Sequence, residues 1–339
     1  MRETIALRDI VPGRFAPGYK GWVNAMLGES LMGTLAVPVA VARGLQGGPL
    51  MVVTAGVHGD EFEGMEAIRE LFAGLKTENL SGTFIAVPVV NPFSYEGQQR
   101  ETPFLWDGLN LARQFPGSDG GSPTRMLAHR WSSWLSSIMS QQDVFIDFHS
   151  AGTRYEYVSM IGYHAVGGEM EAASRKLSEA FGMDRLWRIP DHPDTHVTFN
   201  GWASRQGIPT IATEVCGRGG SQLGDVEELI SGLLRVLRYK GMLAGESEQS
   251  KTGAANVKQV WSTDWVLVRS AGFFRPFVSL LQQVHEGQTI GEIVTISGEP
   301  VEKIISTVSG VIWGIRRFCT VREGDYVYLT ACQEEEELL

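Results

Sequence analysis

Hydrophobic residues follow two different spacings along the first two thirds of the chain. Continuous or alternating apolar runs, typical of strands, cover residues 31–44, 49–57, 82–92, 143–150 and 208–216. Apolar residues three and four positions apart predict helices over 60–75, 124–142, 170–183 and 225–243. Strands that alternate with helices are typical of an α/β fold, so we expect a sheet of parallel strands with helices on its faces.

The helical spacing disappears after a small, polar stretch that is typical of a linker. Beyond it, short apolar runs alternate with glycine turns, and "VHEGQTI" at 284–290 resembles "VREGDYV" at 321–327. This weak internal repeat predicts a small all-β domain. The predicted parts are a first domain over 1–245, a linker over 246–256, the β domain over 257–332 and an acidic, solvated tail over 333–339.

The composition indicates a globular protein with a substantial core, since 43% of the 339 residues are hydrophobic and 20% are charged. A net charge of −10 and a pI near 5.3 give no electrostatic case for binding nucleic acid or an anionic membrane. No signal peptide or membrane-spanning stretch is apparent. Cys216, Cys319 and Cys332 form no disulfide framework, so we expect a cytoplasmic protein.

Polar side chains follow three of the predicted strands. His58 and Glu61 come after the strand over 49–57, while His149 and Glu214 lie at the ends of two later strands. Ligands bind outside the carboxyl ends of strands in open parallel sheets, so these side chains should converge. Two imidazoles and a carboxylate are a common ligand set for catalytic zinc. We therefore predict a metal site at His58, Glu61 and His149, with the first two on one helical turn.

The spacing of His58 and Glu61 is weak evidence when taken alone, because the same pair also occurs at exposed helix starts. The additional strand-end residues favour the metal site. Asp147 precedes His149 by two positions and shares its strand face. We expect Asp147 either to accept a hydrogen bond from an imidazole or to cap a loop.

The segment over residues 91–117 is rich in glycine, proline and aromatic residues. Segments of this length without regular structure are usually functional or disordered, and the aromatic residues favour order. The segment carries Arg100 and Arg113, whose guanidinium groups suit carboxylates and developing oxyanions. A surface salt bridge is the alternative role for either arginine.

Four motifs occur in a fixed order: "HGDE" (58–61), "R…DGLNLARQFPG" (100–117), "DFHS" (147–150) and "TEV" (213–215). This set resembles the succinylglutamate desuccinylase and aspartoacylase family of the zinc carboxypeptidase superfamily, over nearly the whole chain. The resemblance implies an α/β catalytic domain with a zinc-carboxypeptidase-like mixed sheet and flanking helices. It also implies a small C-terminal all-β barrel-sandwich domain.

The resemblance also implies how the metal and its water are held. His58, Glu61 and His149 would bind one Zn²⁺ per chain. Glu214 would be the general base that accepts a proton from water. The predicted cofactor is therefore zinc.

Two arginines have implied roles towards the substrate. Arg100 would polarise the scissile carbonyl, and Arg113 would bind a substrate carboxylate. The sequence departs from the family pattern beside the second arginine, because Ala112 replaces the asparagine of an Asn-Arg pair. We therefore expect poor turnover of N-acetylaspartate and N-succinylglutamate.

The resemblance predicts a zinc-dependent amidohydrolase that deacylates an N-acyl amino acid or similar small molecule, of which Nα-acetyl-diaminobutyrate is one instance. A zinc carboxypeptidase acting on peptides and a non-enzymatic binding protein on the same fold are the alternatives. The β domain also resembles a lipoyl or biotinyl carrier domain, which needs a lysine at its hairpin tip. Glu299 is expected at that tip, and Lys303 in the next strand, so we do not expect carrier function. The expected partner is therefore a small N-acylated substrate, and homo-oligomer formation is left open.

Overall fold

The computed structural model of the chain describes residues 2–30, 33–245 and 260–334. Its helices are α1 (Glu63–Gly74), α2 (Pro92–Glu96), α3 (Pro123–Ile138), α4 (Gly168–Phe181), α5 (Pro193–His196), α6 (Phe199–Arg205) and α7 (Leu223–Tyr239). Short 3₁₀ turns cover Leu7–Asp9, Pro12–Arg14, Thr77–Asn79 and Leu111–Arg113.

The strands fall on either side of residues 246–259. Those before it are β1 (Thr4–Ala6), β2 (Lys20–Ser30), β3 (Gly33–Arg43), β4 (Gln46–Thr54), β5 (Ser81–Val87), β6 (Val144–Ser150), β7 (Tyr155–Tyr157), β8 (Met160–His164), β9 (Leu186–Ile189) and β10 (Thr210–Val215). Those after it are β11 (Val260–Leu267), β12 (Gly272–Pro276), β13 (Gln283–Val284), β14 (Thr289–Val294), β15 (Pro300–Ile305), β16 (Gly310–Arg316), β17 (Thr320–Val321) and β18 (Tyr326–Gln333).

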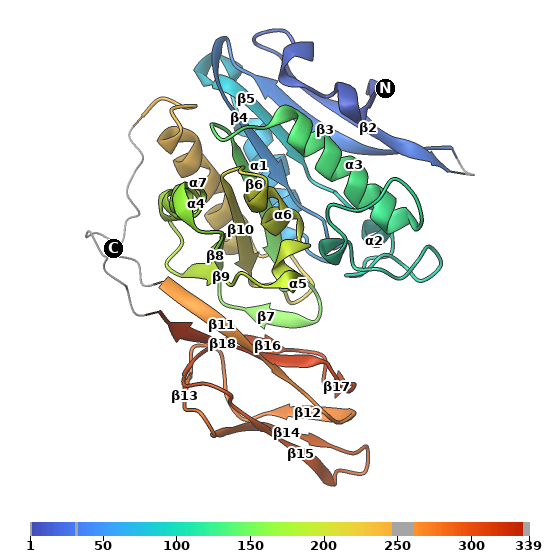
Figure 1. Cartoon of the computed structure of the whole chain (residues 1–339), viewed down its shortest axis with the longest axis vertical. Coiled ribbons are helices and arrows are strands. Elements are labelled where there is room, and N and C mark those ends of the chain that lie inside the picture. The colour runs from blue at the N-terminus through green and yellow to red at the C-terminus, as the bar shows by residue number, and fades with distance from the viewer. Residues whose placement is uncertain (1, 31–32, 246–259, 335–339) are drawn as a thin grey trace.

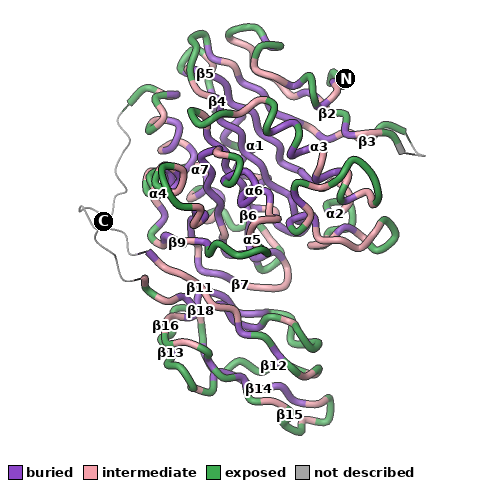
Figure 2. Tube along the Cα trace, in the orientation of Figure 1, coloured by how far each residue is buried: buried purple, intermediate pink, exposed green. Residues whose placement is uncertain are grey.

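One large sheet runs through most of the molecule, in the order β1-β2-β3-β5-β4-β6-β10-β8-β9-β11-β18-β16-β13. Helices α1, α4 and α7 pack on one face of its central part, and α3 and α6 pack on the other (Figure 1). The central strands therefore lie between two apolar layers, and the buried residues concentrate there (Figure 2). Every residue of β6 is buried, as expected for a strand covered on both faces.

The sheet is mixed. Strands β5, β4, β6 and β10 are parallel neighbours, whereas β3 is antiparallel to β2 and β5, and β8 is antiparallel to β10. Only residues 31–32 separate β2 from β3, and so short a connection cannot join parallel strands. The mixed α/β sheet with flanking helices is confirmed, and the parallel strands expected from the strand–helix alternation are found at β5, β4, β6 and β10.

Residues 260–334 fold only into strands. Strands β12, β14, β15 and β17 form a second sheet, which shares an apolar core with β11, β16 and β18. Glu299 lies in the turn between β14 and β15, and Lys303 lies within β15, as predicted. The barrel-sandwich assignment and the domain boundaries stay predictions. The linker over 246–256 and residues 335–339 of the tail lie outside the described residues.

The main sheet continues directly into the C-terminal strands. Strand β9 pairs with β11 in parallel, and β7 pairs with β16 in antiparallel orientation. A separate apolar cluster is buried where these strands meet, formed by Ala151, Tyr157, Val158, Met160, Trp313, Leu329 and Ala331. We call this junction of β7 and β9 with β16 and β11 the seam. It lies across the middle of Figure 1.

The elements of the first domain that the sequence pattern missed are β1, β2, β7, β8, β9, α2, α5 and α6. Strands β7 and β9 have three and four residues, which is too short to show a period of their own. The segment over 91–117 is ordered, as its aromatic residues predict, and contains α2 and one 3₁₀ turn. Within the described residues, no helix has the length and hydropathy needed to span a bilayer.

Candidate metal centre and active site

His58, Glu61 and His149 lie together at one edge of the main sheet, as their positions after strands predict. His58 and Glu61 follow β4, and His149 lies near the end of β6. Their candidate ligand atoms all lie within 4.8 Å of one another. Each of these residues is at most 9% exposed. We call these three residues the strand-end group.

The turn that carries the first two residues of the group is not helical. Helix α1 begins at Glu63, so His58 and Glu61 precede it, and the prediction that they share its first turn is wrong. A side chain at Gly59 would place its Cβ 2.0 Å from the carbonyl oxygen of Ser94. This close approach of two backbones builds a turn between strand and helix, which places both side chains over the sheet edge.

The carboxylate of Glu61 is the centre of the group. Its Oε1 lies 2.7 Å from Nδ1 of His58, and its Oε2 lies 2.9 Å from Nδ1 of His149. Arg100 donates from Nη1 to Oε1 at 2.6 Å, and the backbone N–H of Ser150 donates to Oε2 at 3.2 Å. Burial alone would raise the pKa of Glu61, but the two imidazoles hold it well below its usual range. Glu61 is therefore a buried, ionised carboxylate.

Asn110 fixes the tautomer of His58. Its Oδ1 accepts from the backbone N–H of Ala112 at 2.9 Å and lies 3.0 Å from Nε2 of His58. Because the backbone N–H can only donate, the amide oxygen faces both groups, and Nε2 of His58 must carry a proton. In the neutral ring, Nδ1 then directs a lone pair at the Glu61 carboxylate. Two acceptors at this distance repel each other unless a proton or another cation lies between them.

Asp147 fixes the second imidazole in the same way. Its Oδ2 lies 3.1 Å from Nε2 of His149 and accepts from Nδ2 of Asn200 at 2.8 Å, while its Oδ1 accepts from the Thr54 hydroxyl at 2.7 Å. Burial lowers the pKa of His149, but Asp147 and Glu61 outweigh it and raise the pKa well above its ordinary value. Of the two roles expected for Asp147, the structure shows the hydrogen bond to the imidazole.

The donor set of the strand-end group fits a zinc ion. Two imidazole nitrogens and one carboxylate are a common set for catalytic zinc. Each imidazole has its other nitrogen bound to an oxygen acceptor, which is the usual arrangement behind a metal-binding histidine. The raised pKa of His149 marks the same position as favourable for positive charge.

Glu214 lies beside the strand-end group on the neighbouring strand. In the parallel pairing of β10 with β6, Glu214 is opposite His149, so both side chains leave the same face of the sheet. Among the described residues, its buried Oε2 finds no hydrogen-bond partner. Burial and then the charge of Glu61 raise the pKa of Glu214 to about 8. A carboxyl group in this environment can exchange a proton near neutral pH.

The two predicted arginines extend from the ordered segment over 91–117 towards this site. The residue after Arg100, Glu101, pairs with Arg154 through two hydrogen bonds of 2.8 and 2.6 Å. Arg113 donates to the Ala112 carbonyl at 3.1 Å and forms no ion pair with another residue of the described ranges.

A comparison with known protein families identifies the family of this chain. The profile described as "Succinylglutamate desuccinylase/Aspartoacylase catalytic domain" matches residues 47–240. The chain belongs to the succinylglutamate desuccinylase/aspartoacylase family. The strand-end group, Glu214 and both arginines all lie within the matched residues, so the family resemblance of the four motifs is confirmed.

Relatives in this family cover almost the whole chain. The N-alpha-acetyl-L-2,4-diaminobutyric acid deacetylase of Halomonas elongata is 28% identical over 306 residues, which cover 89% of this chain and 87% of the relative. A succinylglutamate desuccinylase/aspartoacylase structure from Rhodobacter sphaeroides has a TM-score of 0.83 at 27% identity, with 96% and 98% of the two chains covered. The product-bound ectoine utilization protein EutE (DoeB) of Ruegeria pomeroyi shares the fold, with a TM-score of 0.80, 23% identity and coverage of 94% and 96%.

Two buried acids beside the strand-end group were missed as site residues. Glu63 accepts from the backbone N–H of Gly217 at 3.1 Å, and burial raises the pKa of Glu63 to about 7. Asp60 accepts from the backbone N–H and the hydroxyl of Thr153, at 2.9 and 2.7 Å. These acids connect the start of α1 with the segments after β6 and β10. The only sequence signal for them is the density of acids in "HGDEFEG".

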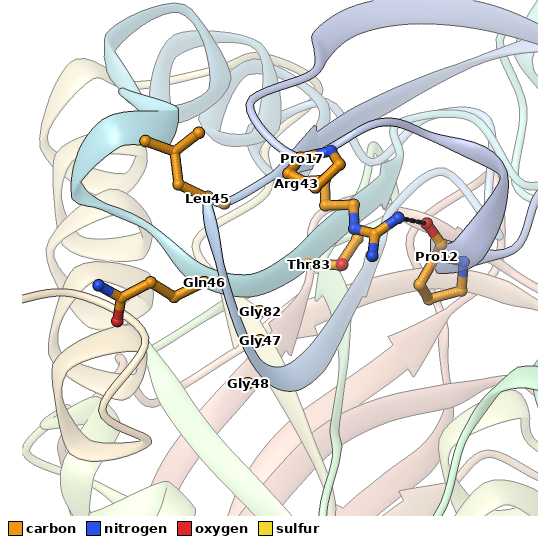
Figure 3. A pocket seen from close by; sticks show the side chains of 10 residues that line it. Pro12, Pro17, Arg43, Leu45, Gln46, Gly47, Gly48, Gly82 and Thr83 are labelled. Atoms are coloured by element: carbon orange, nitrogen blue, oxygen red, sulfur yellow. Dashed lines mark hydrogen bonds between the residues drawn. The ribbon is translucent and has the colours of Figure 1, made fainter.

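A surface pocket lies away from this site, at the amino ends of β4 and β5 (Figure 3). Its lining includes Gln46, Thr83 and Arg43, and Arg43 is its one ionisable side chain. The Arg43 guanidinium donates to the carbonyl oxygens of Pro12, at 3.1 Å, and Phe15. The described residues that line this pocket include no carboxyl, imidazole or thiol group.

Proposed function

We propose that this chain is a zinc-dependent amidohydrolase that deacylates an N-acyl amino acid or a similar small molecule. The observation that carries the proposal is the convergence of His58, Glu61 and His149 beside the unpartnered carboxyl oxygen of Glu214. Membership of the family and the names of the Halomonas and Rhodobacter relatives support deacylation as the reaction.

The catalytic step is divided between the metal site and Glu214. His58, Glu61 and His149 would hold one zinc ion through two Nδ1 atoms and a carboxylate. Zinc, when bound, supplies a Lewis acid that lowers the pKa of water and polarises a carbonyl oxygen. Glu214 takes the proton of the attacking water and then delivers it to the leaving amine. The raised pKa of Glu214, about 8, suits a group that must both accept and release a proton.

The arginines bind the negative charges of the substrate and of the transition state. Arg100 lies 2.6 Å from Glu61, where it can donate to a carbonyl oxygen that gains charge during attack. Arg113 can bind the substrate carboxylate with its fork of donors. The charges of Arg100 and Glu214 both act on Arg113, which supports placing the three groups in one site.

The substrate preference that we propose follows from Ala112. This residue is 3% exposed and packs in the apolar core with Leu111 and Phe115, so its side chain offers no polar atom beside Arg113. N-acetylaspartate and N-succinylglutamate are then poor substrates, and N-acyl amino acids with neutral or cationic side chains are better ones. Nα-acetyl-diaminobutyrate is the leading candidate, because the Halomonas elongata relative is named for deacetylating it.

The proposed organisation places catalysis in residues 1–245 and assigns residues 257–332 to a β domain that meets it at the seam. Cys216, Cys319 and Cys332 are free, which supports a reducing compartment and hence the cytoplasm. The metal would be one zinc per chain.

The test is hydrolysis of a substrate panel by zinc-loaded protein. The panel contains Nα-acetyl-diaminobutyrate, N-acetylaspartate, N-succinylglutamate, a neutral N-acetyl amino acid and a short peptide, with chelator-treated protein and Glu214→Gln as controls. We expect zinc-dependent release of the acyl group, fastest from the neutral and cationic substrates. Preferred cleavage of the peptide would favour the carboxypeptidase alternative, and no turnover of any member would contradict the proposal.

A further inference from the structure

A buried chain of hydrogen bonds continues behind Asp147, on the side away from the strand-end group. Asn200, at the start of α6, donates from Nδ2 to Oδ2 of Asp147 at 2.8 Å. The Oδ1 of Asn200 lies 2.6 Å from Nε2 of His164, the last residue of β8, and accepts from the hydroxyl of Thr198 at 3.0 Å. Asp147, Asn200 and His164 are at most 6% exposed, so water does not compete for these bonds.

The direction of each bond in this chain follows from chemistry. Asn200 donates from its NH₂ group to Asp147, so its amide oxygen, which only accepts, faces His164. Nε2 of His164 must therefore carry a proton and donate it. Burial lowers the pKa of His164 to about 4, which keeps the ring neutral at physiological pH. The chain thus runs in one direction, from the His164 N–H through the Asn200 amide to Asp147.

We propose that Asn200 and His164 are positioning residues of the metal centre, which hold Asp147, and through it the ring of His149, in the orientation that binds zinc. The inference rests on the proposed metal site and deepens it. Asp147 receives three side-chain bonds, from His149, Asn200 and Thr54, so its carboxylate cannot rotate without losing one. Partners behind a metal-binding histidine typically change metal affinity by tenfold to a hundredfold when removed.

Three features distinguish this chain of hydrogen bonds from ordinary core packing. It joins two elements, β8 and α6, to the strand that carries the metal ligand. It consists entirely of polar groups in a region where both faces of the sheet are apolar. It also leaves no room for substitution nearby, since a Cβ at Gly201 would lie 2.9 Å from Cε1 of His164. Helix α6 and the His164 ring are therefore held in direct contact.

The experiment measures zinc affinity by chelator competition on folded, full-length protein. Asn200→Ala removes one bond to Asp147 and should weaken zinc binding by roughly tenfold or more. His164→Leu leaves the Asn200 amide free to turn and should weaken zinc binding by a few-fold. His164→Gln keeps an N–H donor, so its zinc affinity should be close to that of the wild type. The visible spectrum of the Co²⁺-loaded protein should change in Asn200→Ala and not in His164→Gln.

Ser204→Ala is the matched control. Ser204 lies on the same helix, is 2% exposed, and its hydroxyl has no hydrogen-bond partner among the described residues. The Ser204→Ala variant should keep the zinc affinity and the cobalt spectrum of the wild type. If Asn200→Ala lowers the melting temperature but binds zinc as tightly as the wild type, the chain of hydrogen bonds only stabilises the fold and the inference is wrong. A wild-type protein that binds no zinc would instead overturn the proposed function, and this inference with it.

Discussion

The strand-end group and the seam differ in how the chain builds them. The strand-end group uses side chains that follow β4 and end β6, two central strands of which the second half of β4 and all of β6 are buried. The seam uses β7 and β9, which have three and four residues and are held by β16 and β11 from the C-terminal part of the chain. The strand-end group therefore follows central strands of the sheet, whereas β7 and β9 depend on pairing with strands from the C-terminal part of the chain.

The seam nevertheless reaches the site. The backbone N–H of Arg317 donates to the carbonyl of Arg154 at 2.7 Å, and the Arg154 side chain pairs with Glu101, next to Arg100. The C-terminal strands are thereby connected to the segment that carries Arg100. We infer that the strand-end group determines metal binding and that the seam adjusts how the arginine meets the substrate. The following experiments change one region at a time.

The largest effect is expected from Glu214→Gln. Replacing the carboxyl group removes the proposed base but none of the three metal ligands, so zinc content should be unchanged while kcat falls by about a thousandfold or more. Steady-state kinetics and metal analysis on the same preparation provide the measurement. A variant with near-normal kcat would place the base elsewhere.

His164→Gln tests the electrostatics behind the strand-end group. The pKa of His164 is lowered from 6.5 to about 4, so the folded state binds fewer protons than the unfolded state between these values. The free energy of unfolding therefore has its full value, as far as His164 is concerned, above pH 6.5, and it decreases as the pH falls towards 4. The loss amounts to about 3 kcal/mol for one histidine. Chelator-treated His164→Gln should lose this part of the pH dependence in urea unfolding. An unchanged pH profile would show that His164 is not buried as described.

Arg154→Gln tests the seam. Loss of the paired hydrogen bonds to Glu101 should release the segment next to Arg100 and lower kcat/KM by roughly thirtyfold, because small misplacements of a catalytic group are costly. Zinc content should stay the same. Arg69→Gln is the control, since it breaks an exposed arginine–glutamate pair on α1. If Arg154→Gln loses zinc instead, the two regions are not separable.

Arg113→Lys tests recognition at the rim of the site. A lysine keeps the charge but loses the paired donors, so kcat/KM for acids should fall about tenfold. The matching carboxamide should be affected little and is the internal control. An equal loss for both substrates would exclude a carboxylate as the group that Arg113 binds.

The contrast between the regions also explains what the sequence could predict. Strands β4, β6 and β10 show long apolar runs, and parallel neighbours must bring their carboxyl ends to one edge. That argument predicted the positions of the strand-end group and Glu214. It could not predict β7 or β9, whose pairing partners lie far along the chain. The prediction that His58 and Glu61 share a helical turn was also wrong, because the turn before α1 depends on the contact between Gly59 and Ser94.

The supporting residues of the site were unpredictable for the same reason. Asn200 is 53 positions from Asp147 and 36 from His164, and no local pattern links such pairs. Asn110 lies in the motif "DGLNLARQFPG", yet its hydrogen bond to His58 follows only from how the segment over 91–117 folds. Residue types at strand ends can thus suggest which groups do chemistry, whereas the residues that orient them require the structure.

The most direct test of the account is the zinc content of wild-type protein and of His149→Ala, purified in parallel and assayed for deacylation. We predict about one zinc per chain in the wild type, with metal and activity lost together in the variant. The fold should persist in the variant, as measured by circular dichroism. Wild-type protein that contains no zinc and remains active in the presence of chelators would contradict the account.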